Sequence, residues 1–139
     1  MKTLAKLELE TVEHGLRFRA RTRRGFTATL DSGEGMQAPN PPEMLLAALG
    51  TCHGMDVISI LRKKRQQVTA YHIDIEGERR EEHPRSFVSI EMVHRVSGHQ
   101  LSAAAIEEAI RLSETKYCSI RFSLDPAIRI ASRFEIQPA

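Results

Sequence analysis

The chain has no tryptophan, two cysteines and only 5% aromatic residues among its 139. Without large aromatic side chains, its core must be filled mainly by Leu, Ile, Val and Ala. Hydrophobic residues make up 41% and charged residues 27%, which is an ordinary composition for a globular protein. The length corresponds to one domain with a modest core, so we expect a single domain over residues 1–139.

Net charge and long apolar runs are also scarce. The formal net charge is +2, so the overall field gives no reason to expect a nucleic-acid or anionic-membrane partner. Asp56 and Arg62 interrupt the best candidate for the ~18 apolar residues that a membrane span requires, and the charged N-terminal residues do not resemble a secretory signal. We therefore expect a cytoplasmic protein without a membrane partner, in which a permanent disulfide is disfavoured.

Motifs for bound cofactors are missing or badly placed. The six histidines are scattered, and neither His-Glu-x-x-His nor Cys-x-x-Cys occurs, which argues against a zinc site. Gly33–Ala38 has the spacing of a dinucleotide-binding turn, but three prolines close behind it prevent the helix that would receive a pyrophosphate. Basic clusters at 21–24 and 62–65 lack interleaved aromatics and are interpreted as solvated surface. We predict no metal and no bound cofactor.

Hydrophobic periodicity predicts an α+β domain with the order βββ-α-ββ-α-β. Alternation with period two predicts six strands, around residues 7–9, 16–20, 26–30, 71–76, 88–92 and 128–136. A long helix is expected from about Pro42 to Arg65, and a second one begins after Ser102 as N-cap. Because the first helix is apolar on nearly every side, we expect it to be buried in the core.

The two cysteines are the most informative residues. Cys52 lies within the long apolar helix, and Cys118 follows the second helical pattern. The pair has three interpretations: a structural disulfide, two inert core residues, or a nucleophile with its resolving partner. A cytoplasmic location weakens the first. Gly50 and Gly54 flank Cys52, and because each costs roughly 1 kcal/mol inside a helix, they suggest that something approaches this surface closely.

Charged residues decide whether Cys52 is reactive. Asp56 lies one helical turn beyond Cys52 on the same face, where a carboxylate disfavours the thiolate. A reactive cysteine therefore needs a nearby cation. Arg17, Arg19 and Arg21 share one face of the second strand and are the candidates, although a solvated strand edge is the simpler interpretation of each.

Glu43 could position such an arginine, or it could simply favour the positive end of the helix dipole in the first turn. It is nine residues from Cys52, which is ~13 Å along a helix axis, on roughly the opposite face. Both residues belong to one site only if the helix breaks or if Glu43 comes from a second subunit. His53 points about 100° away from Cys52 around the helix, so a Cys–His dyad is disfavoured.

Four segments together resemble the OsmC/Ohr family and, within it, the YhfA-like branch. They are Glu43–Cys52, Asp56–Leu61, Glu78–Pro84 and Leu112–Cys118, and the resemblance extends from about residue 39 to residue 124. It implies an OsmC-like α+β fold in which a long buried central helix packs against antiparallel sheets. It also implies an intertwined homodimer with its active sites at the subunit interface.

The resemblance further implies thiol-dependent reduction of organic hydroperoxides in oxidative-stress defence. By position, Cys52 matches the peroxide-reacting cysteine and Cys118 the resolving cysteine. Glu43 matches the acidic residue that holds the catalytic arginine, for which Arg17 and Arg19 are the candidates. An external dithiol would serve as the reductant. The alternative is a non-catalytic module on the same fold that binds a small apolar or thiol-bearing ligand.

Overall fold

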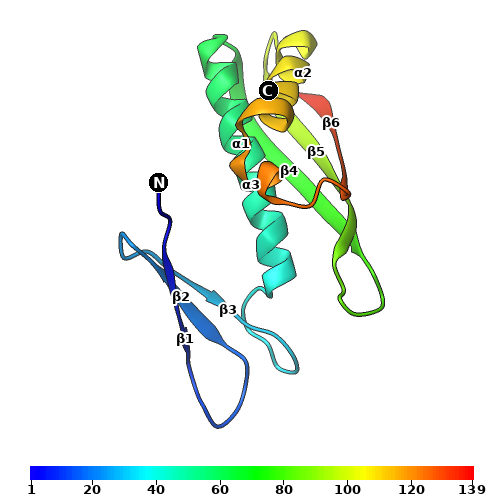
Figure 1. Ribbon diagram of the computed structural model, residues 1–139. Coiled ribbons are helices and arrows are strands. Elements are labelled where there is room, and N and C mark those ends of the chain that lie inside the picture. The colour runs from blue at the N-terminus through cyan, green and yellow to red at the C-terminus, as the bar shows by residue number, and fades with distance from the viewer. The chain divides into compact units, whose positions relative to one another are not determined.

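The computed structural model describes residues 1–139 (Figure 1). Its elements in chain order are β1 (Ala5–Leu9), β2 (Phe18–Thr22), β3 (Thr27–Leu30), α1 (Pro41–Lys63), β4 (Gln67–Arg79), β5 (Phe87–His99), α2 (Ala103–Leu112), a π-helical turn η1 (Ser113–Tyr117), α3 (Ser119–Ser123) and β6 (Arg129–Pro138). The chain divides into two compact units, Met1–Leu45 and Leu46–Ala139. The predicted α+β class is therefore confirmed, with one helical turn and one short helix more than the sequence pattern indicated.

The first unit contains an antiparallel sheet with the strand order β1-β2-β3. Its two hairpin turns contain Gly15 and Gly25 at φ values of 78° and 87°, where glycine is favoured because it lacks a Cβ. Across the strands Glu8 faces Arg19, an opposite-charge pair of the kind that stabilises a sheet. Leu7 and Phe26 remain 66% exposed, so the unit does not cover its own apolar side chains.

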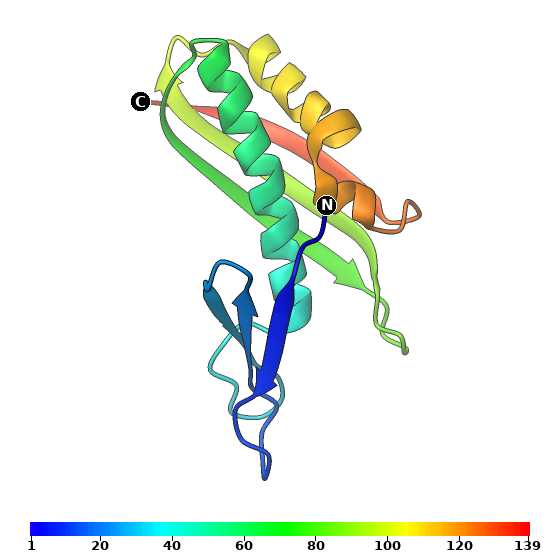
Figure 2. The ribbon, with the colours of Figure 1, turned by 60° about the vertical axis from the view of Figure 1, so that its left-hand side comes forward.

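The second unit contains a sheet with the strand order β4-β5-β6, in which α1 and α2 cover the same face (Figures 1 and 2). β4 and β5 form an antiparallel hairpin, whereas β6 runs parallel to β5. The expectation of wholly antiparallel sheets is therefore wrong for β6. The reason is that the chain crosses over through α2, η1 and α3 between the two strands, as a parallel connection requires.

Close packing of α1 on β4 explains Gly54, whereas a Cβ on Gly50 would meet β4 at an ordinary van der Waals distance. A Cβ placed on Gly54 would lie 3.0 Å from Ile73 Cδ1, and one placed on Gly50 would lie 3.6 Å from Ile75 Cδ1. The predicted close approach thus exists at Gly54, and the approaching group is a strand of the same chain. Gly50 and Gly54 consequently give no support to a ligand at this surface.

The expected full burial of α1 is not found within the chain. Its buried residues begin with the adjacent pair Leu49 and Gly50, continue at intervals of three or four and form one stripe with His53, Val57 and Leu61. Met55, on another side, is 66% exposed. The chain therefore covers only one face of this apolar helix. By length and composition alone α1 could cross a membrane, but the core helix of a globular protein passes the same test.

Two buried clusters make up the core of the second unit. The first joins α1, α2 and β5 through Val57, Leu61, Val96, Ala105, Ile106, Ala109 and Ile110. The second consists of Leu49, Ile90, Met92 and Cys118. α2 begins as predicted, because Ser102 Oγ accepts a hydrogen bond from the backbone N–H of Ala105 at 3.2 Å.

Candidate functional site

The structure brings the two cysteines together in the second unit. Cys118 is completely buried, and Cys52 is partly buried and packs against the cluster that contains it. Both are free thiols. Cys118 immediately precedes α3, and its Sγ accepts a hydrogen bond from the backbone N–H of Arg121 at 3.3 Å. A cysteine from the middle of α1 and one from the segment after α2 therefore share one site.

The two cysteines differ in their surroundings. Burial raises the pKa of the Cys118 thiol, and contact with Cys52 raises it further, while the backbone N–H groups of Arg121 and Ile120 oppose this shift. Cys118 is consequently a neutral thiol at neutral pH. Cys52, at the edge of the buried cluster, is the more accessible of the two. This difference suits Cys52 for meeting a substrate first and Cys118 for acting second.

Asp56 is bonded to the segment that carries Cys118. Ser113 Oγ donates a hydrogen bond to Asp56 Oδ2 at 2.8 Å, and the Ser113 side chain is completely buried. Ser113 is the first residue of η1, and its carbonyl oxygen accepts the backbone N–H of Cys118 at 2.9 Å. The carboxylate that shares a helix face with Cys52 thus has a partner, and this partner is linked directly to the second cysteine.

His53 belongs to a buried group of rings that includes His94 and Tyr71. The centroids of the two histidine rings are 6.5 Å apart, and Tyr71 Oη and His94 Nδ1 are joined by a hydrogen bond of 2.6 Å. Burial lowers the pKa of His53 and lowers that of His94 to about 4, whereas it raises the pKa of Tyr71. All three side chains are therefore neutral at neutral pH.

The imidazole of His53 is not positioned as a partner of Cys52. Both of its ring nitrogens are buried without a hydrogen-bond partner, as is Nε2 of His94. A neutral ring enclosed in the core does not supply the positive charge that would favour a thiolate. The structure thus agrees with the low expectation for a Cys–His dyad.

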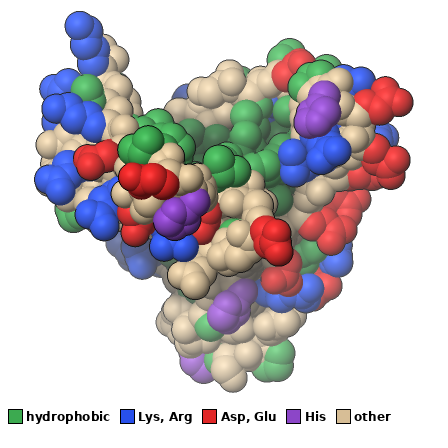
Figure 3. Space-filling view, turned by 90° about the horizontal axis from the view of Figure 1, so that it is seen from below, with side chains coloured by type: hydrophobic (Ala, Val, Ile, Leu, Met, Phe, Trp, Pro, Cys, Tyr) green, Lys and Arg blue, Asp and Glu red, His purple; other side chains and the backbone are tan.

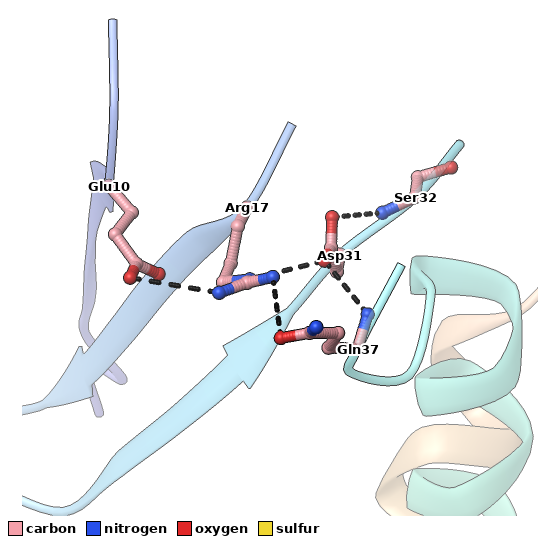
Figure 4. Close-up of polar contacts among 5 residues, drawn as sticks. All are labelled: Glu10, Arg17, Asp31, Ser32 and Gln37. Carbon is pink, nitrogen blue, oxygen red and sulfur yellow. Dashed lines mark hydrogen bonds and ion pairs between the residues drawn. The ribbon is translucent and has the colours of Figure 1, made fainter. Parts of the chain in front are cut away.

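Arg17 is held by residues of the first unit (Figure 4). Its Nε donates to Asp31 Oδ2 at 3.1 Å, its Nη2 donates to Gln37 Oε1 at 3.3 Å, and its Nη1 is 3.8 Å from Glu10 Oε1. Asp31 is 5% exposed and also accepts the backbone N–H groups of Gln37 and Ser32, which lower its pKa below the ordinary value. Within its own unit, the acidic residue that holds Arg17 is therefore Asp31.

Arg19 lies on β2, where it faces Glu8 on one side and Thr29 on the other. It lines a shallow hollow of the first sheet together with Lys6 and Arg21. These neighbours are those of a charged strand surface. They give Arg19 no fixed acceptor comparable to the one that Arg17 has in Asp31.

Glu43 forms a capping box at the start of α1. Its Oε1 accepts the backbone N–H of Asn40 at 3.0 Å, and its own N–H donates to Asn40 Oδ1 at 2.9 Å. α1 is unbroken from Pro41 to Lys63, so the helix does not break between Glu43 and Cys52. Of the two conditions for a shared site, only a Glu43 from a second subunit remains.

Two residues near the cysteines were missed from the sequence. They are Ser113, which no local motif marks, and Arg121, which is absent from the candidate cations named above. The pKa of His53 is lowered mainly by burial and, to a smaller extent, by the positive charge of Arg121. The negative charges of Glu114 and Asp56 act in the opposite direction. The field of Arg121 therefore reaches the helix position next to Cys52. Its place three residues after Cys118 was the available signal.

No group of three or more His, Cys, Asp and Glu side chains in the chain could hold a metal ion. The site is instead defined by two adjacent thiols within a mixed α+β fold of two three-stranded sheets. Residues 32–133 match the family of OsmC-like proteins, and the chain belongs to this family. The predicted family and its fold class are thereby confirmed.

Individual relatives agree with this assignment. Protein YhfA of Escherichia coli K12 is 40% identical over 125 residues, which cover 90% of this chain and 93% of that protein. The crystal structure of a hypothetical protein from Aquifex aeolicus VF5 has a TM-score of 0.87 at 32% identity, over 100% of this chain and 98% of that chain. The organic hydroperoxide resistance protein OhrB of Bacillus subtilis shares the fold, with a TM-score of 0.61 at 12% identity over 99% and 98% of the two chains.

Proposed function

We propose that this protein reduces organic hydroperoxides in oxidative-stress defence, with Cys52 as the peroxide-reacting cysteine and Cys118 as the resolving cysteine. The observation that carries the proposal is the packing of an accessible thiol against a buried one. Membership of the OsmC-like family, and a fold shared with an organic hydroperoxide resistance protein, support it. The setting would be the cytoplasm, where both thiols are kept reduced between turnovers.

The reaction needs two bond exchanges. The Cys52 thiolate attacks the terminal oxygen of the hydroperoxide; a sulfur–oxygen bond forms, the oxygen–oxygen bond breaks, and the alkoxide leaves as an alcohol after taking a proton. Cys118 then attacks the sulfur of the Cys52 sulfenic acid. The disulfide forms, the sulfur–oxygen bond breaks, and the hydroxyl leaves as water with the proton of the Cys118 thiol. An external dithiol restores both thiols by exchange.

The charged residues complete the proposal. A free thiol with a pKa of about 8.5 is only a few per cent thiolate at pH 7, so a cation must favour the thiolate of Cys52. We assign this role to Arg17 or Arg19, positioned by Glu43 of a second copy of the chain. One oxygen of Glu43 is occupied by Asn40, and the other is available for an arginine.

Homodimer formation is supported by the apolar surface of the second unit. A groove along α1 and β4 is lined by Ala47, Gly50, Thr51, Gly54, Met55, Ile58, Tyr71, Ile73 and Ile75. Apolar side chains also reach the surface on the face drawn in Figure 3. Covering this groove with a second copy would bury the side of α1 that the chain itself leaves exposed. Cys52 itself packs against a cluster of apolar side chains, and such surroundings favour an organic hydroperoxide over hydrogen peroxide.

The test is turnover of cumene hydroperoxide with a dithiol reductant. The wild-type protein should consume the peroxide, and Cys52→Ser should abolish consumption. Ser59→Ala, an exposed change on the same helix, serves as the control and should retain it. Full activity of Cys52→Ser would refute the proposal.

The second candidate is a non-catalytic module that binds a small apolar or thiol-bearing ligand. It is favoured by the contacts of Arg17 and Glu43 within the first unit, where Arg17 pairs with Asp31 and Glu43 accepts the N–H of Asn40. Under this alternative the wild type and Cys52→Ser are equally inert towards peroxide. Both would instead bind an apolar thiol with similar affinity, which calorimetry measures.

A further inference from the structure

One partly buried hydrogen bond ties α1, which carries Cys52, to the segment that carries Cys118. It runs from Ser113 Oγ, at the start of η1, to Asp56 Oδ2, one helical turn beyond Cys52 on α1. The Ser113 side chain has no exposed surface, and its hydroxyl donates to no other group in the chain. Because a buried hydroxyl without a partner is costly, this bond fixes how η1 sits against α1.

The same serine also holds the backbone of Cys118. The N–H of Cys118 donates to the Ser113 carbonyl oxygen five residues earlier, which is the wide spacing of a π-helix. On the other side, the carbonyl oxygen of Cys118 accepts the N–H of Phe122 at 3.2 Å. Single π-helical turns are rare and occur frequently at functional sites. Here the wide turn sets the direction of the backbone at Cys118, where η1 ends.

These bonds form a short path from one cysteine to the other. It starts at Cys52 and passes along one turn of α1 to Asp56, across the hydrogen bond to Ser113, and through its carbonyl oxygen to the amide of Cys118. A disulfide requires the two Cα atoms to lie ~4.4–6.8 Å apart with suitable Cβ directions. Any group that fixes η1 against α1 therefore controls how often the two sulfur atoms reach this geometry.

We propose that Asp56 and Ser113 are positioning residues that hold Cys118 in place for disulfide formation with Cys52. The inference rests on the proposed two-cysteine reaction and concerns its second step alone. Neither residue touches the peroxide. Their bond keeps the resolving thiol beside the sulfenic acid, so that condensation proceeds as an intramolecular reaction at high effective concentration. It also gives Asp56 a role other than opposing the Cys52 thiolate.

The experiment separates the two steps in single-turnover reactions with cumene hydroperoxide. Sulfenic acid is trapped with dimedone, and the disulfide is followed by mass spectrometry after rapid thiol blocking. Ser113→Ala should slow disulfide formation about tenfold, the factor expected for losing one hydrogen bond to a charged group. It should leave sulfenic acid formation within twofold of wild type, and more dimedone adduct should accumulate.

Two further variants serve as comparisons. Thr115→Ala is the matched control, because Thr115 lies in the same turn and its hydroxyl bonds only the Arg111 carbonyl at 2.8 Å. It should form the disulfide at the wild-type rate. Asp56→Asn removes the charge but keeps an acceptor oxygen for Ser113, so its disulfide rate should stay closer to wild type than that of Ser113→Ala.

The outcomes distinguish failure of this inference from failure of the proposed function. Wild-type disulfide formation with an equal rate in Ser113→Ala would overturn the positioning role and leave the proposed function standing. Absence of sulfenic acid and disulfide in the wild type would overturn the proposed function and this inference together. A third readout is independent of peroxide: amide hydrogen exchange at Cys118 should accelerate in Ser113→Ala but not in Thr115→Ala, and unchanged protection would also overturn the inference.

Discussion

The candidate site residues have different kinds of contacts in the two units of the chain. In the second unit, Cys52 packs against the buried cluster that contains Cys118, so the two thiols need no other chain to meet. In the first unit, Arg17 is bonded to Asp31, and its sheet leaves large apolar side chains exposed. Packing within the second unit is thus enough to bring the two thiols together. Arg17 could act on Cys52 only while it also remains bonded to Asp31.

The largest effect should come from removing either thiol. Cys52→Ser should eliminate peroxide consumption, whereas Cys118→Ser should still form sulfenic acid once but lose turnover supported by a dithiol. The reason is that only Cys52 needs to be accessible to the substrate, while Cys118 is completely buried. Dimedone trapping and a peroxide assay measure the two quantities. Equal behaviour of the two variants would show that the cysteines do not divide the reaction between them.

Acid should weaken the second unit through its buried histidines. Burial lowers the pKa of His94 from 6.5 to about 4, and that of His53 is also lowered. Between these values the unfolded chain binds more protons than the folded one, so stability is full above about pH 6.5 and falls as the pH drops towards 4. For His94 alone the loss is roughly 3 kcal/mol.

Urea unfolding at several pH values measures this loss. His94→Gln should flatten the dependence between pH 6.5 and 4, while His72→Gln, at an exposed position of β4, should not change it. Asp31, whose pKa is lowered, contributes stability that is lost only as the pH falls below its ordinary value of 3.8. Constant stability from pH 7 to 4.5 would contradict the assignment of neutral buried rings.

Arg17→Gln tests whether the first unit contributes the activating charge. A cation close to a thiol changes the thiolate population by roughly tenfold or more, so this variant should slow oxidation of Cys52 by about that factor. Arg23→Gln, in the turn after β2, is the matched control and should have no effect. The measurement is the second-order rate of Cys52 oxidation by cumene hydroperoxide. An unchanged rate for Arg17→Gln would leave Arg19 as the candidate in this unit.

The smallest effect is expected at the beginning of α1. Asn40→Ala removes the side chain that accepts the N–H of Glu43, and loss of such a cap costs about 1 kcal/mol of stability. Urea unfolding should detect this change, with Asn40→Asp, which keeps an acceptor oxygen, close to wild type. A stability equal to wild type in Asn40→Ala would mean that Glu43 does not depend on the capping box.

The sequence allowed the long, strongly periodic elements to be predicted. α1, the β4–β5 hairpin and the Ser102 cap follow from local patterns, although β4 begins four residues before its predicted start and β5 ends seven residues after its predicted end. β6 was placed in an antiparallel sheet because a strand pattern carries no information about the direction of its neighbour. η1 and α3 were missed because five residues are too few to display a helical period.

The candidate site was predictable only in part, for a similar reason. That Cys52 and Cys118 lie side by side could be inferred only from the family resemblance, since 66 residues separate them. Asp56 was interpreted as a charge that acts on Cys52, because no local pattern reveals a partner 57 residues away; its bond to Ser113 depends on how η1 packs on α1. The close approach indicated by the two helix glycines exists at Gly54 alone, and sequence could not tell that the approaching group is a strand of the same chain rather than a ligand.

Mass spectrometry tests most directly whether the two neighbouring thiols form a redox pair. The reduced protein is treated with one equivalent of cumene hydroperoxide, blocked with an alkylating reagent and digested without reductant. We expect the peptides containing Cys52 and Cys118 to be recovered joined by a disulfide, with the loss of two hydrogens. Recovery of both cysteines as alkylated thiols, with the peroxide unconsumed, would contradict this expectation.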